Sequence, residues 1–68
     1  MTWTQDQLVR GLGILLARPG WNITRAAAAT GASYFTIINW KDKRTRVSNA
    51  YMRPLAALLE KEDVFAEL

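Results

Sequence analysis

The side chains best suited to binding chemistry lie in one short basic segment, residues 41–46, which holds four cations and a single acidic residue, Asp42. Lysine and arginine at this density bind the phosphates of nucleic acids, although a run of charges is more often a solvated loop. We expect phosphate contact here, because the segment directly follows a stretch rich in aromatic and aliphatic side chains. The predicted phosphate-contacting residues of this segment are Lys41, Lys43, Arg44 and Arg46.

The stretch before the basic segment, residues 33–40, has one side that would face water on an isolated domain. At 100° per residue, Ile37 and Trp40 share an inward side of a helix, and Phe35 and Ile38 point away from it. Clustered exposed apolar groups usually mark an interface. A protein partner is one interpretation, but we favour the major groove of DNA, where apolar groups meet thymine methyls and asparagine pairs with adenine. The predicted base-contacting residues are Ser33, Tyr34, Phe35, Ile38 and Asn39.

The composition argues against several other kinds of chemistry. The 68 residues include no cysteine and no histidine. Without them, the usual zinc sites, disulfide frameworks, general bases and hydrolytic triads each lose a member. We therefore predict that the protein is not an enzyme, and we expect no catalytic residue, no metal, no cofactor and no small-molecule ligand.

The formal net charge of +3 conceals a division along the chain. Before Pro54, eight basic residues stand against two acidic ones, and from Pro54 onward one basic residue stands against four acidic ones. On its own, this division is explained equally well by ordinary solvation. Taken with the basic segment, it predicts a negatively charged partner, double-stranded DNA, with the acidic tail directed elsewhere.

Every segment with a clear hydrophobic period has the helical one, and the first begins close to the N-terminus. Thr4 and Gln7 have the spacing of a capping box, and leucines then recur at i, i+4, i+7 and i+8. This pattern predicts a helix over about 4–17. Gly11 and Gly13 weaken it, so the helix depends on its packing, or a neighbour approaches closely there.

Two short helices follow, joined by a tight corner. Asn22 is a good N-cap for a helix that runs to Thr30, and Gly31 stands where a left-handed residue would end that helix. Ser33 then caps the next helix, over 33–40.

The last predicted helix begins near Arg53, after a short turn over 49–52. Pro54 argues against a longer helix from Ser48, because proline lacks the N–H donor and clashes with the carbonyl four residues back. At or near the first helical position, the same proline is well tolerated. The inward residues of this helix are Leu55, Leu58 and Leu59.

The corner between the two short helices carries a family resemblance. Ala27, Gly31, Ile37 and Trp40 are an alanine, a glycine four positions on, and hydrophobic residues six and nine positions after that. This spacing resembles the helix-turn-helix of Cro and the lambda-type phage repressors. Residues 22–27 are also similar to the DNA-binding helices of the factor for inversion stimulation. The physical requirements agree, since a small residue is needed where the helices touch and a glycine permits the reversal.

The resemblance implies an all-α, lambda-repressor-like fold of four to five short helices. Residues 1–68 would form a single helix-turn-helix DNA-binding domain, with the motif at about 23–40 and the helix over 33–40 in the major groove. Free amides at the start of the second helix favour anions, so a second phosphate site is predicted there. Its residues are Asn22, Thr24 and Arg25.

These features predict a sequence-specific DNA-binding transcription regulator of a phage or mobile element, in its simplest form a repressor that occludes a promoter. Two other interpretations stay open. One is an architectural or recombination accessory factor with the same fold, and the other is a protein-interaction module such as an antitoxin-like inhibitor. No apolar run approaches the ~20 residues that cross a bilayer, so we expect no membrane partner and a cytoplasmic location, in a bacterium or a phage-infected host cell.

One short recognition helix reads only a few base pairs, so we expect a homodimer on a palindromic operator. The acidic tail contains a small apolar face, spaced i, i+1 and i+4, that DNA would not attract. The predicted dimer residues are Val64, Phe65 and Leu68. An equally weighted alternative is that Phe65 folds back over the core of its own chain.

Overall fold

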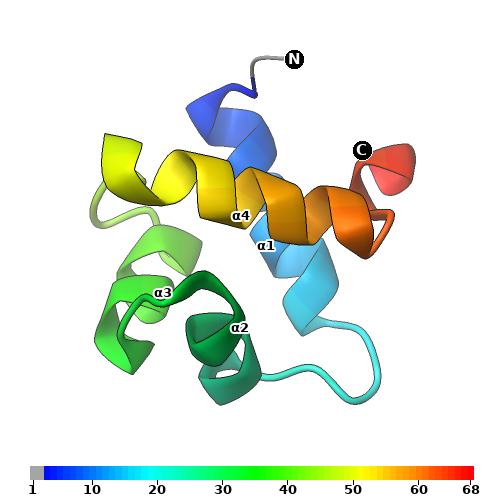
Figure 1. Cartoon of the computed structure of the whole chain (residues 1–68), viewed down its shortest axis with the longest axis horizontal. Helices are drawn as coiled ribbons and strands as arrows, with labels where there is room; N and C mark the ends of the chain where they lie inside the picture. The colour runs from blue at the N-terminus through cyan, green and yellow to red at the C-terminus, as the bar shows by residue number, and fades with distance from the viewer. Residues whose placement is uncertain (1–2) are drawn as a thin grey trace.

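The computed structural model describes residues 3–68 and contains four α-helices, one short 3-10 helix and, within these residues, no strand (Figure 1). The helices are α1 (Gln5–Leu16), α2 (Ile23–Thr30), α3 (Tyr34–Lys41), α4 (Asn49–Lys61) and the 3-10 helix η1 (Val64–Glu67). The prediction of a small all-α domain is therefore confirmed. No helix in residues 3–68 has both the length and the apolar character needed to cross a membrane.

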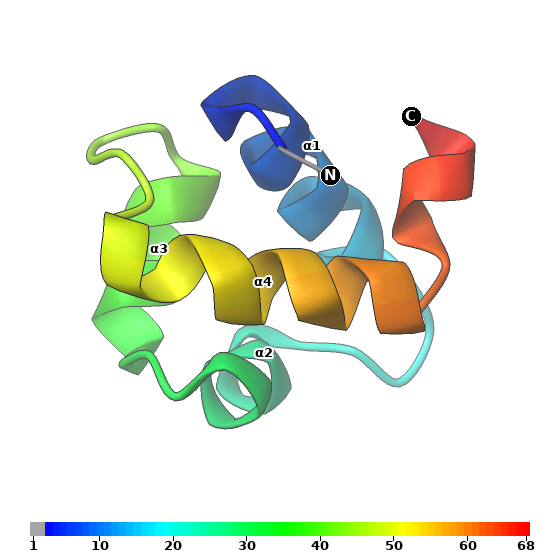
Figure 2. The same cartoon turned by 45° about the horizontal axis from the view of Figure 1, so that its top comes forward.

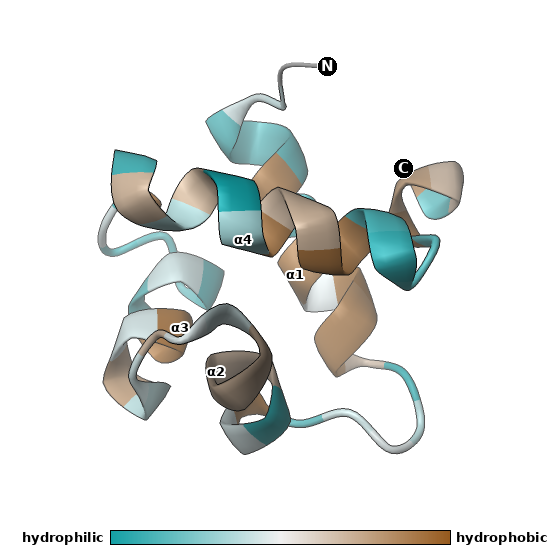
Figure 3. Ribbon diagram, in the orientation of Figure 1, coloured by the Kyte–Doolittle hydropathy of each residue, from teal (hydrophilic) through white to brown (hydrophobic). Residues whose placement is uncertain are grey.

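The helices enclose one hydrophobic core. α1 packs against α4, α3 and η1, and α2 packs against α3 and α4. The α2–α3 pair therefore packs against α1 and α4 (Figures 1 and 2). Figure 3 shows hydrophobic residues along α1 and on part of α4. The largest fully buried side chains are Leu8, Leu12, Leu15, Ile37, Val47, Leu55, Leu59 and Val64.

The start of α1 follows from local sequence. Thr4 accepts a hydrogen bond from the amide of Gln7 at 3.1 Å, and the amide of Thr4 donates to the Gln7 side chain at 3.0 Å. This is the predicted capping box. A Cβ added at Gly11 would lie 2.8 Å from a methyl of Leu59, whereas one at Gly13 would meet nothing within 4 Å. The close approach of α4 therefore accounts for Gly11 only.

The prediction for the last helix is wrong at its N-terminal end, because α4 begins at Asn49 and contains Pro54 in its interior. The helix lacks the bond that residue 54 would donate to the carbonyl of Ala50. Ala50 is exposed, so water can bond to its carbonyl in place of the missing donor. The first turn is also held from outside the helix: the ring of Tyr51 packs on Trp40, with centroids 5.4 Å apart.

The C-terminal segment folds onto its own chain, and this removes one residue from the predicted dimer surface. Val64 has no exposed area and belongs to the core, so it offers nothing to a second copy. Phe65 stacks on Trp3, with ring centroids 3.3 Å apart and planes 6° from parallel. This arrangement is the alternative in which Phe65 covers its own core. Of the three residues predicted to form the dimer contact, only Leu68 is exposed, at 38%.

Polar contacts also hold the acidic segment in place. Arg18 forms a salt bridge with Glu67 and donates to the carbonyl of Glu62. The indole of Trp3 donates to Glu60 at 2.8 Å. In Figures 1 and 2, η1 and α3 lie at opposite ends of the molecule. The acidic tail is thus held away from the basic segment that follows α3.

Candidate nucleic-acid interface

The corner between α2 and α3 is built by small residues and by one left-handed glycine. Ala26 is fully buried and Ala27 is nearly so. Gly31 ends α2 at φ 79°, and its amide donates to the carbonyl of Ala27 at 2.9 Å. Thr30, the only buried polar residue of the described chain, donates its hydroxyl to the carbonyl of Ala26 at 2.9 Å. The predicted roles of Ala27 and Gly31 in forming a tight corner are confirmed.

Ser33 caps α3 as predicted, and this role engages its hydroxyl. The oxygen accepts the amide of Thr36 at 3.1 Å and shares a second hydrogen bond with the Thr36 hydroxyl at 2.8 Å. Both hydroxyls are therefore held within the first turn of the helix. The predicted contact of Ser33 with a base stays a prediction, and it would have to compete with this cap.

The two sides of α3 divide as predicted. Ile37 is fully buried and Trp40 is 2% exposed, so both lie in the core. On the other side Phe35 is 75% exposed and Tyr34 is 47% exposed, and the two rings meet edge to face with centroids 5.7 Å apart. Ile38 and Asn39 are both half-buried. The four exposed or half-exposed side chains form what we call the α3 face: Tyr34, Phe35, Ile38 and Asn39.

The chain leaves α3 through a tight reversal that places the basic segment beside it. Lys43 adopts the left-handed conformation at φ 60°, and its amide donates to the carbonyl of Trp40 at 3.1 Å. The amide of Arg44 donates to the carbonyl of Asn39 at 2.9 Å. This pair of bonds is a Schellman motif, with a lysine where glycine is usual. The structure thus accounts for the sharp end of α3 without a glycine.

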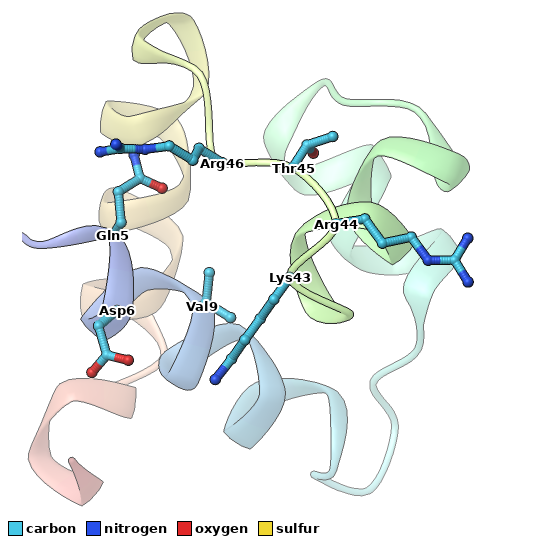
Figure 4. A pocket seen from close by; sticks show the side chains of 7 residues that line it. All are labelled: Gln5, Asp6, Val9, Lys43, Arg44, Thr45 and Arg46. Carbon is cyan, nitrogen blue, oxygen red and sulfur yellow. The ribbon is translucent and has the colours of Figure 1, made fainter.

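The cations of the basic segment differ in their partners. Lys41 lies 3.4 Å from Asp42 in an exposed ion pair. Lys43, Arg44 and Arg46 take part in none of the salt bridges formed within residues 3–68. In Figure 4, Arg44 and Arg46 point in opposite directions from the loop, and Lys43 extends past Val9 of α1. Charges spread in this way suit separate phosphates along a nucleic-acid backbone better than a single bound anion.

A hollow of about 260 Å³ separates this segment from the start of α1 (Figure 4). The two elements are joined beside it by Gln5, a residue that sequence reasoning missed. The Gln5 side chain donates to the carbonyl of Val47 at 2.8 Å and accepts the amide of Val47 at 2.9 Å. No local pattern signals this contact, because the partners are 42 residues apart. Gln5 therefore anchors the end of the basic segment to α1.

Replacing Gln5 by alanine is expected to destabilise the protein by about 2 kcal/mol, because both partly buried backbone groups of Val47 lose their partner. Gln5→Glu keeps an acceptor for the amide but turns a carboxylate oxygen toward the Val47 carbonyl in place of the donor, so it should also destabilise the protein. Thermal melts measure the stability, and hydrogen exchange at the Val47 amide reports the anchor. Unchanged exchange at that amide in the alanine variant would show that Gln5 does not hold the loop.

A second hollow, of about 570 Å³, lies where α2 begins. It brings together three of the predicted phosphate-contacting residues, Asn22, Thr24 and Lys41, and the base-reading candidate Tyr34. Residues from both ends of α3 thus meet the N-terminus of α2, whose first amides have no partner inside the helix. Its complete lining is Leu16, Trp21, Asn22, Ile23, Thr24, Tyr34 and Lys41.

Arg25 is more restrained than the sequence suggests. Its guanidinium donates to the carbonyl of Gly20 at 2.8 Å and lies 3.9 Å from the centre of the Trp21 ring. Its backbone amide donates to the side chain of Asn22 at 2.8 Å, which is the predicted N-cap of α2. The predicted phosphate contact of Arg25 would therefore use a side chain that already holds the loop before α2.

Comparisons of this chain with protein-family models, with curated proteins and with solved structures give no match. The function is therefore argued from the geometry of the chain itself.

Proposed function

We propose that the protein is a sequence-specific double-stranded DNA-binding transcription regulator of the helix-turn-helix type. α3 enters the major groove and presents the α3 face to base edges. By covering promoter DNA the protein acts as a repressor, without needing any catalytic group or cofactor.

The observation that carries the proposal is the position of the α3 face between two sets of polar and cationic residues. At one side lie Asn22 and Thr24, in the hollow at the start of α2 that Tyr34 of the α3 face also lines. The basic segment follows the C-terminal end of α3, with Lys43, Arg44 and Arg46 in no salt bridge within residues 3–68. A helix that reads a groove needs phosphate contacts on both of the flanking strands, and we propose that these two sets of residues make them.

The size of the domain favours two copies on the operator. Its extents are 27 × 26 × 18 Å. Successive major grooves on one face of DNA are about 34 Å apart, so one copy covers a single groove. We propose a homodimer on a palindromic site, with a contact that excludes the buried Val64. Sedimentation of the free and DNA-bound protein tests this arrangement, and a monomer in both states contradicts it.

Titration into labelled random duplex DNA at two salt concentrations tests the main proposal. A protein that neutralises several phosphates binds saturably and loses affinity steeply as salt rises, by a factor of about 3 per phosphate contact between 50 and 200 mM. Absence of saturable binding at either concentration contradicts the proposal.

One observation favours a second candidate, a protein-interaction module. Phe35 is 75% exposed and forms an apolar pair with Tyr34, a surface that a protein partner would also cover. This candidate predicts no duplex binding in the same titration, so one experiment separates the two.

A further inference from the structure

The helix that would enter the groove has an unusual lack of charge. From Tyr34 to Trp40, α3 contains no acidic or basic residue. Its single charged residue, Lys41, is its last, and it is paired with Asp42 at 3.4 Å. Guanine is most often read by the paired donors of arginine or lysine, and the cytosine amino group by a carboxylate. The middle of this helix offers neither.

The polar side chains of the first turn are largely occupied. The hydroxyls of Ser33 and Thr36 bond to each other at 2.8 Å, and the Ser33 oxygen also accepts the amide of Thr36. Next to them Phe35 is 75% exposed, and its ring is supported from one side by Tyr34 at 84°. The most prominent group on the α3 face is thus a benzene ring, which makes no hydrogen bond to a base edge and gains most by covering an apolar group.

In the major groove, the C5-methyl of thymine is the apolar group on the base edges. We propose that Phe35 recognises this methyl, so that the protein selects A·T pairs with thymine placed under the start of α3. Asn39, one turn further along the same face, complements this selection, since its amide matches the donor and acceptor of adenine. The inference rests on the proposed DNA-binding function and adds the chemical group that is read.

The choice of DNA over a protein as the occupant of this face follows from charge. The face continues into Lys41, Lys43, Arg44 and Arg46, whereas the acidic residues of the chain's last segment lie at the opposite end of the molecule. An apolar face followed by cations, three of which form no salt bridge within residues 3–68, complements a methyl group beside phosphates.

The test begins with selection of duplexes from a randomised library by the full chain. Each thymine of the selected duplex is then replaced by uracil, which lacks only the methyl. At one position in each half-site, we expect affinity to fall about fourfold, the effect of no longer burying one methyl group. At that position, the pair of 5-methylcytosine with guanine should bind about fourfold more tightly than the unmethylated C·G pair.

Protein variants connect the methyl to its reader. Phe35→Ala should bind the thymine and uracil duplexes equally, whereas Asn39→Ala should keep the fourfold preference for thymine and lose discrimination at a different pair. Phe35 is largely exposed, so the alanine variant should fold, and a thermal melt checks this. A Phe35→Ala variant that still prefers thymine over uracil by the full factor overturns the assignment to Phe35.

Two failures are distinguishable. If the protein binds random duplex in a salt-dependent way but uracil has no effect at any position, or selection yields only G·C pairs under α3, the methyl inference is overturned and the DNA-binding function stands. If no duplex binds saturably at either salt concentration, both proposals are overturned and the aromatic pair belongs to a protein contact.

Discussion

Replacement of Trp40 by alanine is expected to leave much of the protein unfolded near room temperature. The side chain is 2% exposed, and truncating a buried tryptophan costs about 3 to 5 kcal/mol. A domain of this length has a total stability of roughly 3 to 10 kcal/mol. The substitution also removes the ring on which Tyr51 packs, and with it a contact that holds the first turn of α4. Circular dichroism melts give the size of the loss.

Asn39→Ala is the matched control, because it changes the adjacent residue on the other side of the same helix. Asn39 is half-buried and none of the side-chain hydrogen bonds within residues 3–68 involves it, so its melt should stay close to that of the original protein. Binding should instead lose about 1 to 3 kcal/mol of discrimination at one base pair. A melt as damaged as that of Trp40→Ala would place Asn39 among the residues that hold the fold and remove it from base reading.

Simultaneous replacement of Lys43, Arg44 and Arg46 by glutamine is expected to weaken binding to every duplex alike. If each cation neutralises one phosphate, the slope of log affinity against log salt should become shallower by about 0.9 for each, or about 2.7 for the three. Glutamine retains a polar side chain of related shape and leaves the left-handed conformation at Lys43 as demanding as before. Titrations at several salt concentrations, with selected and random duplexes, measure both effects.

Lys61→Gln is the control for lost positive charge, because Lys61 ends α4 and lies beside the acidic segment at the far end from α3. It should leave the slope unchanged. A triple variant with altered base preference and an intact slope would mean that the basic segment reads sequence and does not hold phosphates.

The N-terminal ends of α1, α2 and α3 and the end of α2 were predictable because each depends on a few neighbouring residues. Thr4 with Gln7, Asn22 with Arg25, and Ser33 with Thr36 all form bonds within three residues. Gly31 ends α2 for the equally local reason that it reaches φ 79° at little cost. The inward positions of Ile37 and Trp40 followed from helical spacing alone. The α3 face and the basic segment after it were therefore predictable from the sequence.

Two features of the structure depend on contacts from outside the segment concerned: the start of α4, which was predicted wrongly, and the burial of Val64. Pro54 does favour a helix start, but α4 begins five residues earlier, at Asn49. Tyr51 packs on Trp40 and holds the first turn of α4, and the buried leucines of α4 hold the turns after Pro54. The spacing of the tail does give it an apolar face, but Val64 turns into the protein's own core. A pattern shows that a face is apolar without showing what covers it.

By itself, the sequence determined the first three helices and their N-caps, the tight α2–α3 corner and the cation-rich segment after it, since all of these depend on interactions within a few residues. Only the tertiary structure decided which elements meet: Gln5 with Val47 across 42 residues, Trp3 with Phe65, and Arg18 with Glu67. Such pairs carry no periodic signal, because a contact between distant residues depends on how whole helices pack and on the entropy of closing the chain between them. That packing holds the acidic tail against its own domain and leaves the α3 face exposed.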